Sequence, residues 1–424
     1  MYASFTFSLL LAASGYAAPV EHRPGQEYTV VFDSSHADLP AVDDVLSQLS
    51  LSPSHPDVRH VYDNHAFRGF HATMNAHCLD ILNNMTTIAL IEPAIPVRTA
   101  TIARIAITAR INAPWGLERI STAITPNTTT TDLQDLSYTY TYANPTLGSG
   151  TDLYILDTGA LTSHIAFTSR ATLSWTFDSS PLDNDGHGTH VTGIAAGAAI
   201  GVASSANILV VKALDVNGTG FSSNVVGAID HVLLAHAKRR TDADFKGSVI
   251  NMSLEGSGIS AAMNLALAAA TEAGIHVVVA AGNSGADACD VSPASAGGVM
   301  GAVITVGSVG PEDRVSGFSN TGACVDVYAP GEDVVSAWNS GDGDLKCLSG
   351  TSMASPHVAG IVAYAIAGNA TLAGDVRLMK EWVRMTALKG VVTGRRSVLG
   401  EELLLANNGM PLGPRALQYG LIQG

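Results

Sequence analysis

Charged residues are scarce in this sequence of 424 residues. Only 14% of the residues are charged, and no long run of Lys or Arg occurs anywhere. Acidic residues outnumber basic ones by 37 to 22, which gives a formal net charge of -15. Nucleic acids and anionic membrane surfaces are bound by basic patches, so we expect neither as a partner.

Long apolar runs are also missing, apart from one short run at the N-terminus. The segment Phe5 to Ala13 is apolar and is followed by small residues from Ser14 to Ala18. This pattern predicts a secretory signal peptide over residues 1–17, and the alternative is a buried N-terminal element. No later run is long enough to span a membrane. We therefore expect secretion to the cell exterior, with delivery to a vacuole as the alternative.

The residues from about 19 to 108 alternate between strand-like and helix-like segments. Strands are expected at Tyr28–Phe32, Phe67–Thr73 and Thr87–Glu92, and helices at Val42–Leu49 and Cys78–Met85. The segment is under a hundred residues long, which is enough for one small core. The pattern predicts a small α+β domain.

Beyond Asn112 short, almost continuous apolar runs are separated by helical segments. The runs lie at 153–156, 208–211, 249–250 and 277–279, and the helical segments at 188–199, 225–240 and 261–273. Strands that are apolar on both sides belong to a parallel sheet covered by helices on both faces. The fold class expected here is therefore α/β, and its chemistry should lie at the carboxyl ends of the strands.

Four polar side chains follow these strands or open helices. Asp157 ends one strand, His187 opens a Gly/Ala-rich helix, Asn283 follows another strand, and Ser352 stands in a small-residue stretch. The order Asp, His, Ser is one of the known orders of a catalytic triad. Ser352 would be the nucleophile, His187 its base and Asp157 the residue that orients the imidazole. Asn283 would donate to the developing oxyanion, together with the Ser352 backbone N–H.

Simpler interpretations of the same residues are weaker. Asp157-Thr158-Gly159 could be an aspartic-protease motif, but the sequence has no second copy of it. His187 and His190 could bind a metal ion, but no His-Glu-x-x-His pattern accompanies them. His190 and His357 are expected to be structural histidines of the core.

Six ordered blocks carry a family resemblance. They read APWGLERI from Ala113, YILDTG from Tyr154, GHGTHV from Gly186, NMSL from Asn251, AAGN from Ala280 and GTSMASPHV from Gly350. With these blocks the chain resembles the subtilisin-like serine proteases, and among them the secreted fungal proteinase K-like group. The resemblance implies a catalytic domain over 108–408, an inhibitory propeptide over 18–107 and a C-terminal tail over 409–424.

The resemblance also implies a peptide-binding cleft. Its residues would be Gly218, Gly220, Phe221, Ser253, Leu254, Glu255, Gly256, Ala281 and Gly282. Extended segments of this kind bind a peptide as an added strand. The family usually has Gly where this chain has Glu255, which predicts a preference for basic or polar side chains near that position.

Several partners and modifications follow from the same resemblance. The substrates would be proteins and peptides, the propeptide would inhibit the enzyme until self-cleavage before Asn112, and the enzyme would be a monomer that needs no cofactor for catalysis. A structural Ca²⁺ is also implied, with Asp326 as a carboxylate ligand beside backbone carbonyls between Pro293 and Val303. Separately from the resemblance, Asn127 begins an Asn-x-Thr motif in a Thr-rich run and is the best candidate for N-glycosylation.

Three of the four cysteines lie in the predicted catalytic domain. Cys289, Cys324 and Cys347 allow three different pairings by composition alone. Some relatives of proteinase K resemble this chain at Cys289 and Cys324 and join them. The resemblance therefore implies a Cys289–Cys324 disulfide, with Cys347 outside it as a largely buried thiol.

Two other classes of function remain open at this point. A pseudoprotease would bind peptides without cutting them, although the complete set of Asp157, His187, Ser352 and Asn283 argues against that. A serine esterase would favour a Gly-x-Ser-x-Gly elbow, whereas the residues here read Gly-Thr-Ser-Met-Ala.

Overall fold

The structure is a computed structural model that describes residues 26–34, 39–64, 67–99, 103–107, 113–125, 136–178, 180–299, 301–394 and 401–410. The predicted signal peptide, Asn127 and residues 411–424 of the predicted tail lie outside the described residues. Within the described residues, no helix is both long enough and apolar enough to cross a lipid bilayer.

The N-terminal part forms a small α+β domain, as the sequence predicts. Its antiparallel sheet has the order β2-β3-β1-β4, from β1 (Glu27–Phe32), β2 (Val58–Asp63), β3 (Arg68–Thr73) and β4 (Ile88–Pro93). Helices α1 (Val42–Gln48) and α2 (Ala76–Asn83) cover one face and share a core with it. Strand β2 was not expected from the sequence, and its pairing with β3 contains a register shift between Val58 and His60.

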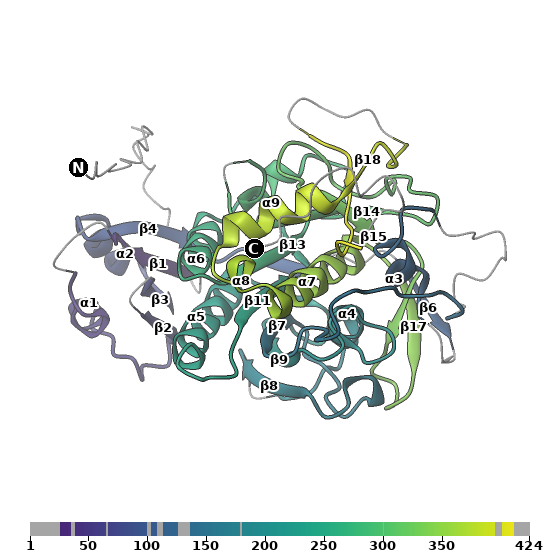
Figure 1. The fold of residues 1–424 in the computed structure, drawn as a ribbon. Coiled ribbons are helices and arrows are strands. Elements are labelled where there is room, and N and C mark those ends of the chain that lie inside the picture. The colour runs from purple at the N-terminus through teal and green to yellow at the C-terminus, as the bar shows by residue number, and fades with distance from the viewer. Residues whose placement is uncertain are drawn as a thin grey trace, which may run out of the picture.

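The larger domain is built on a nine-stranded sheet of order β18-β19-β15-β14-β13-β11-β7-β9-β8 (Figure 1). The strands are β7 (Thr151–Asp157), β8 (Ala171–Thr176), β9 (Asn207–Lys212), β11 (Gly247–Met252), β13 (His276–Ala280), β14 (Ile304–Val309), β15 (Val327–Pro330), β18 (Leu388–Lys389) and β19 (Leu404–Leu405). Every pairing in this sheet is parallel except that of β18 with β19. The predicted α/β class with a parallel sheet is confirmed.

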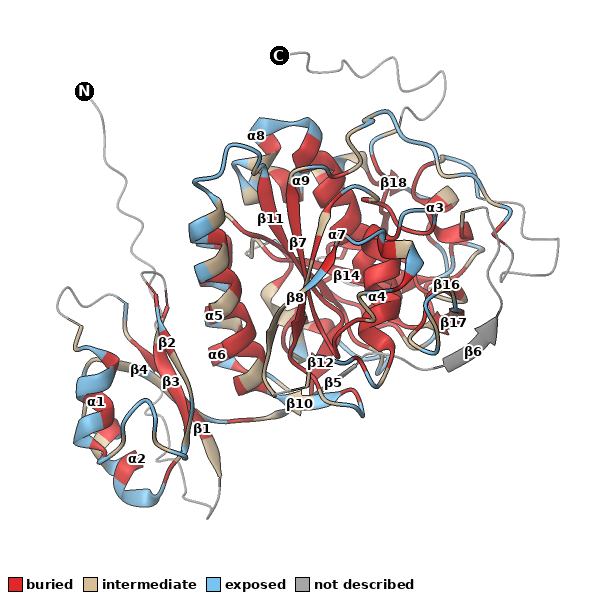
Figure 2. Ribbon diagram, turned by 90° about the horizontal axis from the view of Figure 1, so that it is seen from below, coloured by how far each residue is buried: buried red, intermediate tan, exposed pale blue. Residues whose placement is uncertain are grey.

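Helices cover both faces of this sheet, because successive strand residues point to opposite sides. Leu153 and Ile155 share one core with α4 (His187–Ala196) and α7 (Thr351–Gly368). The intervening Tyr154 and Leu156 share the other core with α5 (Ser222–Arg239) and α6 (Ala261–Glu272). Figure 2 shows α7 buried along almost its whole length, close to the centre of the domain.

Three connections tie the two domains together. The sheet of the small domain lies beside α5 and α6 (Figure 2). Strand β5 (Pro96–Thr99) pairs between β10 (Thr219–Phe221) and β12 (Leu254–Gly256) of the larger domain. Strand β6 (Ala103–Ile107) pairs with β17 (Leu345–Ser349), which also pairs with β16 (Val334–Ala337). Strands β10 and β12, which carry predicted cleft residues, are thus both paired with the last part of the predicted propeptide.

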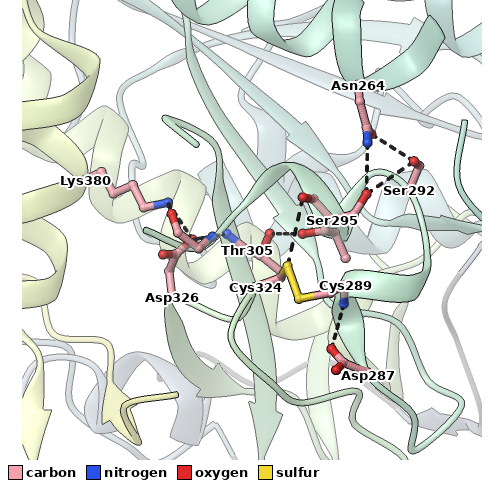
Figure 3. The surroundings of a disulfide bond; sticks show 11 residues. Asn264, Asp287, Cys289, Ser292, Ser295, Thr305, Cys324, Asp326 and Lys380 are labelled. Atoms are coloured by element: carbon pink, nitrogen blue, oxygen red, sulfur yellow. Dashed lines mark hydrogen bonds and ion pairs between the residues drawn. A yellow bond between two sulfur atoms is a disulfide. The ribbon is translucent and has the colours of Figure 1, made fainter. Parts of the chain in front are cut away.

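The remaining elements of the larger domain are short or peripheral. They are α3 (Trp115–Arg119), α8 (Ala370–Ala373), α9 (Val376–Thr386) and the 3₁₀ turns at Ile165–Phe167, Ala288–Asp290 and Ala294–Ala296. The predicted disulfide joins Cys289 to Cys324, with a Cα–Cα distance of 5.3 Å (Figure 3). Cys347 is buried on β17 and takes no part in it, as expected.

Candidate active site

Ser352 is the second residue of the central helix α7, and the residues around it fix its backbone. Pro356 lies one turn later and has no N–H to donate to the Ser352 carbonyl, as a helix would require. The hydroxyl of Ser253 donates to that carbonyl instead, at 2.9 Å. The Ser352 hydroxyl in turn donates to the Ser253 carbonyl at 3.2 Å. A predicted cleft residue and the predicted nucleophile are therefore held directly against each other.

His187 and Asp157 form a fully buried pair. His187 is the first residue of α4, Asp157 is the last residue of β7, and Nδ1 of the imidazole lies 2.7 Å from a carboxylate oxygen. Burial raises the pKa of Asp157, while His187 and the backbone N–H of Thr158 oppose that shift. The imidazole Nε2 is buried and has no hydrogen-bond partner among the described residues. The pair leaves one imidazole nitrogen available to accept a proton.

Asp183 holds the start of α4 in place, a role the sequence did not suggest. One of its oxygens accepts the Gly186 N–H at 2.8 Å, and the other accepts the Thr189 N–H at 2.9 Å. These are N–H groups of a first helical turn, which no residue within the helix can satisfy. A Cβ on Gly188 would stand 2.0 Å from the Gly159 carbonyl, so the glycine lets α4 approach the end of β7. The weak signal in the sequence is an acidic residue shortly before a predicted helix start, where a negative charge is favourable.

The amide of Asn283 is oriented by Thr351, the residue before the nucleophile. Its carbonyl oxygen accepts the Thr351 N–H at 2.9 Å and the Thr351 hydroxyl at 3.0 Å. That hydroxyl also accepts the Gly282 N–H at 3.1 Å. The Asn283 amide nitrogen is buried with no partner among the described residues. A hydrogen-bond donor without a partner among the described residues is thus kept beside Thr351, the residue before Ser352, and this pattern suits stabilisation of a negative charge.

Glu255 lies in the same wall of the site. Its side chain is only 6% exposed, and one carboxylate oxygen accepts the backbone N–H of Asn283 at 2.8 Å. A Cβ on Gly282 would come within 2.5 Å of that oxygen, so the glycine leaves room for the carboxylate. Glu255 is therefore directed at the loop that carries Asn283, and not at bulk solvent.

The predicted cleft residues line an antiparallel strand. Strand β5 lies between β10 and β12, with Val97 opposite both Gly220 and Gly256, and Thr99 opposite Leu254. Gly218 precedes β10, and Ala281 and Gly282 connect β13 to Asn283. Every predicted cleft residue is therefore found on β10, on β12, directly beside these strands or on the Asn283 loop.

The other two histidines of the blocks are structural, as expected. His190 is fully buried, and its Nε2 lies 2.9 Å from the Lys346 carbonyl and 3.1 Å from the Val334 carbonyl. His357 is buried and bonds to the Met353 carbonyl at 2.8 Å. In the part of the chain that the structure describes, no group of three or more His, Cys, Asp or Glu side chains could hold a metal ion.

The sequence that forms this site matches a known protein family. The sequence pattern of Peptidase S8, described as the subtilase family, matches residues 148–410. The chain belongs to the subtilase family. This match covers more than half of the chain and includes Asp157, His187, Asn283 and Ser352.

Individual subtilases are similar over much of the chain. Subtilisin-like serine protease AsES from Sarocladium strictum is 38% identical over 373 residues, which cover 88% of this chain and 87% of the relative. Subtilisin-like serine protease Pen ch 18 from Penicillium rubens is 45% identical over 261 residues, and the chain spans only 50% of that relative's length. The crystal structure of a cold adapted subtilisin-like serine proteinase matches 70% of this chain and 98% of its own, with 36% identity and a TM-score of 0.60.

Asp326, the predicted calcium ligand, is not one of the predicted catalytic residues. It is fully buried, and one carboxylate oxygen accepts the Thr305 N–H at 2.9 Å. The same oxygen lies 2.9 Å from the ammonium nitrogen of Lys380, a residue that sequence reasoning missed. Burial raises the pKa of Asp326, while the charge of Lys380 opposes that shift.

Proposed function

We propose that this chain is a serine endopeptidase that is made as a self-processing zymogen and secreted. The observation that carries the proposal is a set of two buried, unused groups. The Nε2 of His187 and the amide nitrogen of Asn283 have no partners among the described residues, whereas their neighbouring polar atoms are fixed by Asp157 and Thr351. Unsatisfied buried polar groups are rare in folded proteins and call for an explanation, and a substrate would supply the missing partners.

The proposed reaction follows from these groups. The Ser352 oxygen attacks the carbonyl carbon of the peptide bond while its proton passes to Nε2 of His187. The oxyanion accepts hydrogen bonds from the Asn283 side-chain amide and from the backbone N–H of Ser352. The imidazolium then gives its proton to the departing amine, leaving an acyl group on Ser352. Water, deprotonated by His187, hydrolyses this ester and restores the serine.

The segment at the end of the small domain supports the zymogen part of the proposal. Strand β5 pairs with β10 and β12 in the manner in which an added peptide strand would bind. It ends at Thr99, which lies opposite Leu254, the residue that follows Ser253. We therefore expect the first cut between Thr99 and Asn112, which includes the predicted boundary after residue 107. The small domain would then remain bound as an inhibitor until it is degraded.

The test compares the wild type with Ser352→Ala. The variant should lose peptidase activity by several orders of magnitude, because the members of a triad act as a unit. It should also keep residues 18–107 attached, while mass spectrometry of the secreted wild type shows an N-terminus between Thr99 and Asn112. Cys347→Ser is the matched control, and it should keep both activity and processing because a buried thiol is usually an inert hydrophobe.

Three outcomes would contradict the proposal or part of it. Normal processing of purified Ser352→Ala, without added protease, would contradict self-cleavage. A wild type that neither cuts peptides nor reacts with a fluorophosphonate probe would be a peptide-binding pseudoprotease. A wild type that reacts with the probe and hydrolyses esters but no peptides would be an esterase.

A further inference from the structure

The ammonium group of Lys380 lies in a cage of oxygen atoms. It donates to the backbone carbonyls of Gly298 at 2.6 Å, Val303 at 2.7 Å and Gly301 at 3.0 Å. The fourth oxygen is that of the Asp326 carboxylate, at 2.9 Å. Lys380 is 6% exposed and Asp326 is fully buried. Figure 3 shows the lysine reaching from α9 to Asp326, close to the disulfide.

This cage is built from the atoms that a calcium ion would use. Calcium is bound by carboxylates and backbone carbonyls, and the family resemblance places a calcium ion among Asp326 and carbonyls of Pro293–Val303. Here the lysine nitrogen stands within hydrogen-bonding distance of all four oxygens. Arg384 adds a second positive charge, with its guanidinium 3.0 Å from the Asp326 carbonyl and 3.5 Å from its carboxylate. The residues present therefore do not fit a metal ion.

The four oxygen atoms around the nitrogen of Lys380 favour its charged form. Burial lowers the pKa of Lys380, since the ammonium is removed from water, while Asp326 opposes that shift. A neutral amine has only two N–H groups and would turn its lone pair toward one of the oxygens. An ammonium supplies three donors, and its charge is balanced by the carboxylate. Four oxygens at 2.6 to 3.0 Å are thus best satisfied by the charged form.

We infer that Lys380 is an internal cation that takes the place of a structural calcium ion. The helix α9 carries it to the carbonyls of Gly298, Gly301 and Val303, and the ammonium joins them to the segment that leads from Asp326 into β15. The Asp326 side of the cage is also connected to the disulfide, because Cys324 lies two residues before Asp326 in the chain. The folded state should therefore not need calcium at this cage, and removal of the ammonium should turn the cage into a metal site.

The experiment compares melting temperatures in the Ser352→Ala background, which prevents self-digestion. The parent, Lys380→Ala and Lys389→Ala are each melted in excess EGTA and in millimolar CaCl₂. Lys389 is an exposed lysine and serves as the matched control. In EGTA the Tm of Lys380→Ala should fall by roughly 5–15 °C, because Asp326 is left as a buried and only partly compensated charge. Calcium should restore a good part of this loss, with no comparable rise in the parent or in Lys389→Ala.

A second substitution identifies the site of any calcium effect. In Lys380→Ala combined with Asp326→Ala, the carboxylate is gone and the calcium-induced rise in Tm should disappear. The inference is wrong if calcium raises the Tm of Lys380→Ala no more than that of Lys389→Ala. It is also wrong if EGTA lowers the Tm of the parent and Asp326→Ala abolishes that effect, because the cage would then hold calcium despite the lysine.

Chemical labelling tests the cage even if Lys380→Ala fails to fold. Reductive methylation of the folded parent, followed by mass spectrometry, measures how often each lysine amine is exposed. Lys380 should react more slowly than Lys389, on the order of a hundredfold or more, since its reaction requires local opening. Equal rates for the two lysines would overturn the proposed arrangement.

Discussion

The proposed oxyanion donor, Asn283, depends on the orientation of its side-chain amide. An asparagine side chain can present either its oxygen or its nitrogen, and its hydrogen-bond partners decide which. At Asn283 both donors of Thr351 bind the oxygen, so the nitrogen is the end that remains available. Glu255 adds a bond to the backbone N–H of the same residue. These contacts exist before any substrate binds, and such preorganisation is what makes an oxyanion donor effective.

The carboxylate of Glu255 is expected to influence which substrate side chains are preferred. This carboxylate lies beside Gly282 and Asn283, among the residues predicted to line the cleft. We expect Glu255→Gly to lower the ratio of kcat/KM for substrates with basic side chains to kcat/KM for aliphatic ones by about tenfold, the equivalent of 1.4 kcal/mol. A peptide library digested by the two enzymes measures this ratio.

Glu255→Gln separates charge from position. The amide can still accept the Asn283 N–H, so the rate on aliphatic substrates should stay close to that of the wild type. The basic preference should nevertheless fall, because the negative charge is lost. Identical cleavage profiles for wild type, Glu255→Gln and Glu255→Gly would show that Glu255 does not contact the substrate.

At the scale of elements, the small domain is held partly by a helix end. Glu92 at the end of β4 accepts hydrogen bonds from the Ser260 hydroxyl at 2.6 Å, from the Ala261 N–H at 3.1 Å and from the Ala262 N–H at 3.2 Å. Ala261 and Ala262 open α6, where N–H groups and the helix dipole favour a negative charge. A carboxylate of one domain thus caps a helix of the other.

We expect Glu92→Ala to weaken inhibition by the small domain. Loss of a cap and of a favourable charge at a helix end is worth on the order of 1–2 kcal/mol, so Ki should rise by about 5- to 30-fold. The measurement is inhibition of the mature enzyme by separately produced small domain. Asp80→Ala, a substitution on the exposed side of α2, is the control and should leave Ki unchanged. A Ki for Glu92→Ala equal to the control value would mean that the cap does not contribute to binding.

At the scale of the whole molecule, the sequence predicts the sheet, its covering helices and the main site residues. Each of these has a local signal, because Asp157 and Asn283 follow apolar strands and Ser352 opens an apolar helix. The disulfide and the cleft residues were predicted only through the family resemblance. The disulfide is confirmed, and the pairing of β5 with β10 and β12 is consistent with the predicted cleft.

What the sequence does not reveal depends on contacts between distant segments. Lys380 lies in an amphipathic helix where a lysine normally faces solvent, and its partners Gly298 and Val303 are 82 and 77 residues earlier. Glu92 meets residues 168 to 170 positions away. Asp183 and Thr351 likewise act through hydrogen bonds that only the folded chain creates. No periodicity or motif encodes such pairs.

The buried histidines are expected to make the stability of the whole molecule depend on pH. Burial lowers the pKa of His190 to about 3 and those of His236, His276 and His357 to about 4 each, because the imidazolium would be removed from water. In the unfolded chain these side chains titrate near their ordinary pKa of about 6.5. Between these values the unfolded state binds more protons than the folded state, so the free energy of unfolding must fall as the pH falls.

We therefore expect stability to be highest above about pH 6.5 and to decrease steeply toward pH 4, by up to about 1.4 kcal/mol per pH unit for each buried histidine. Thermal melts of Ser352→Ala between pH 8 and pH 4 measure this loss without self-digestion. His276→Gln isolates one contribution, since glutamine can still bond to the Ala373 carbonyl that His276 contacts at 3.2 Å but does not titrate. Its Tm should fall less steeply with decreasing pH than that of the parent. Parallel curves for the two proteins would show that His276 titrates alike in the folded and unfolded states, and that its burial does not lower its pKa.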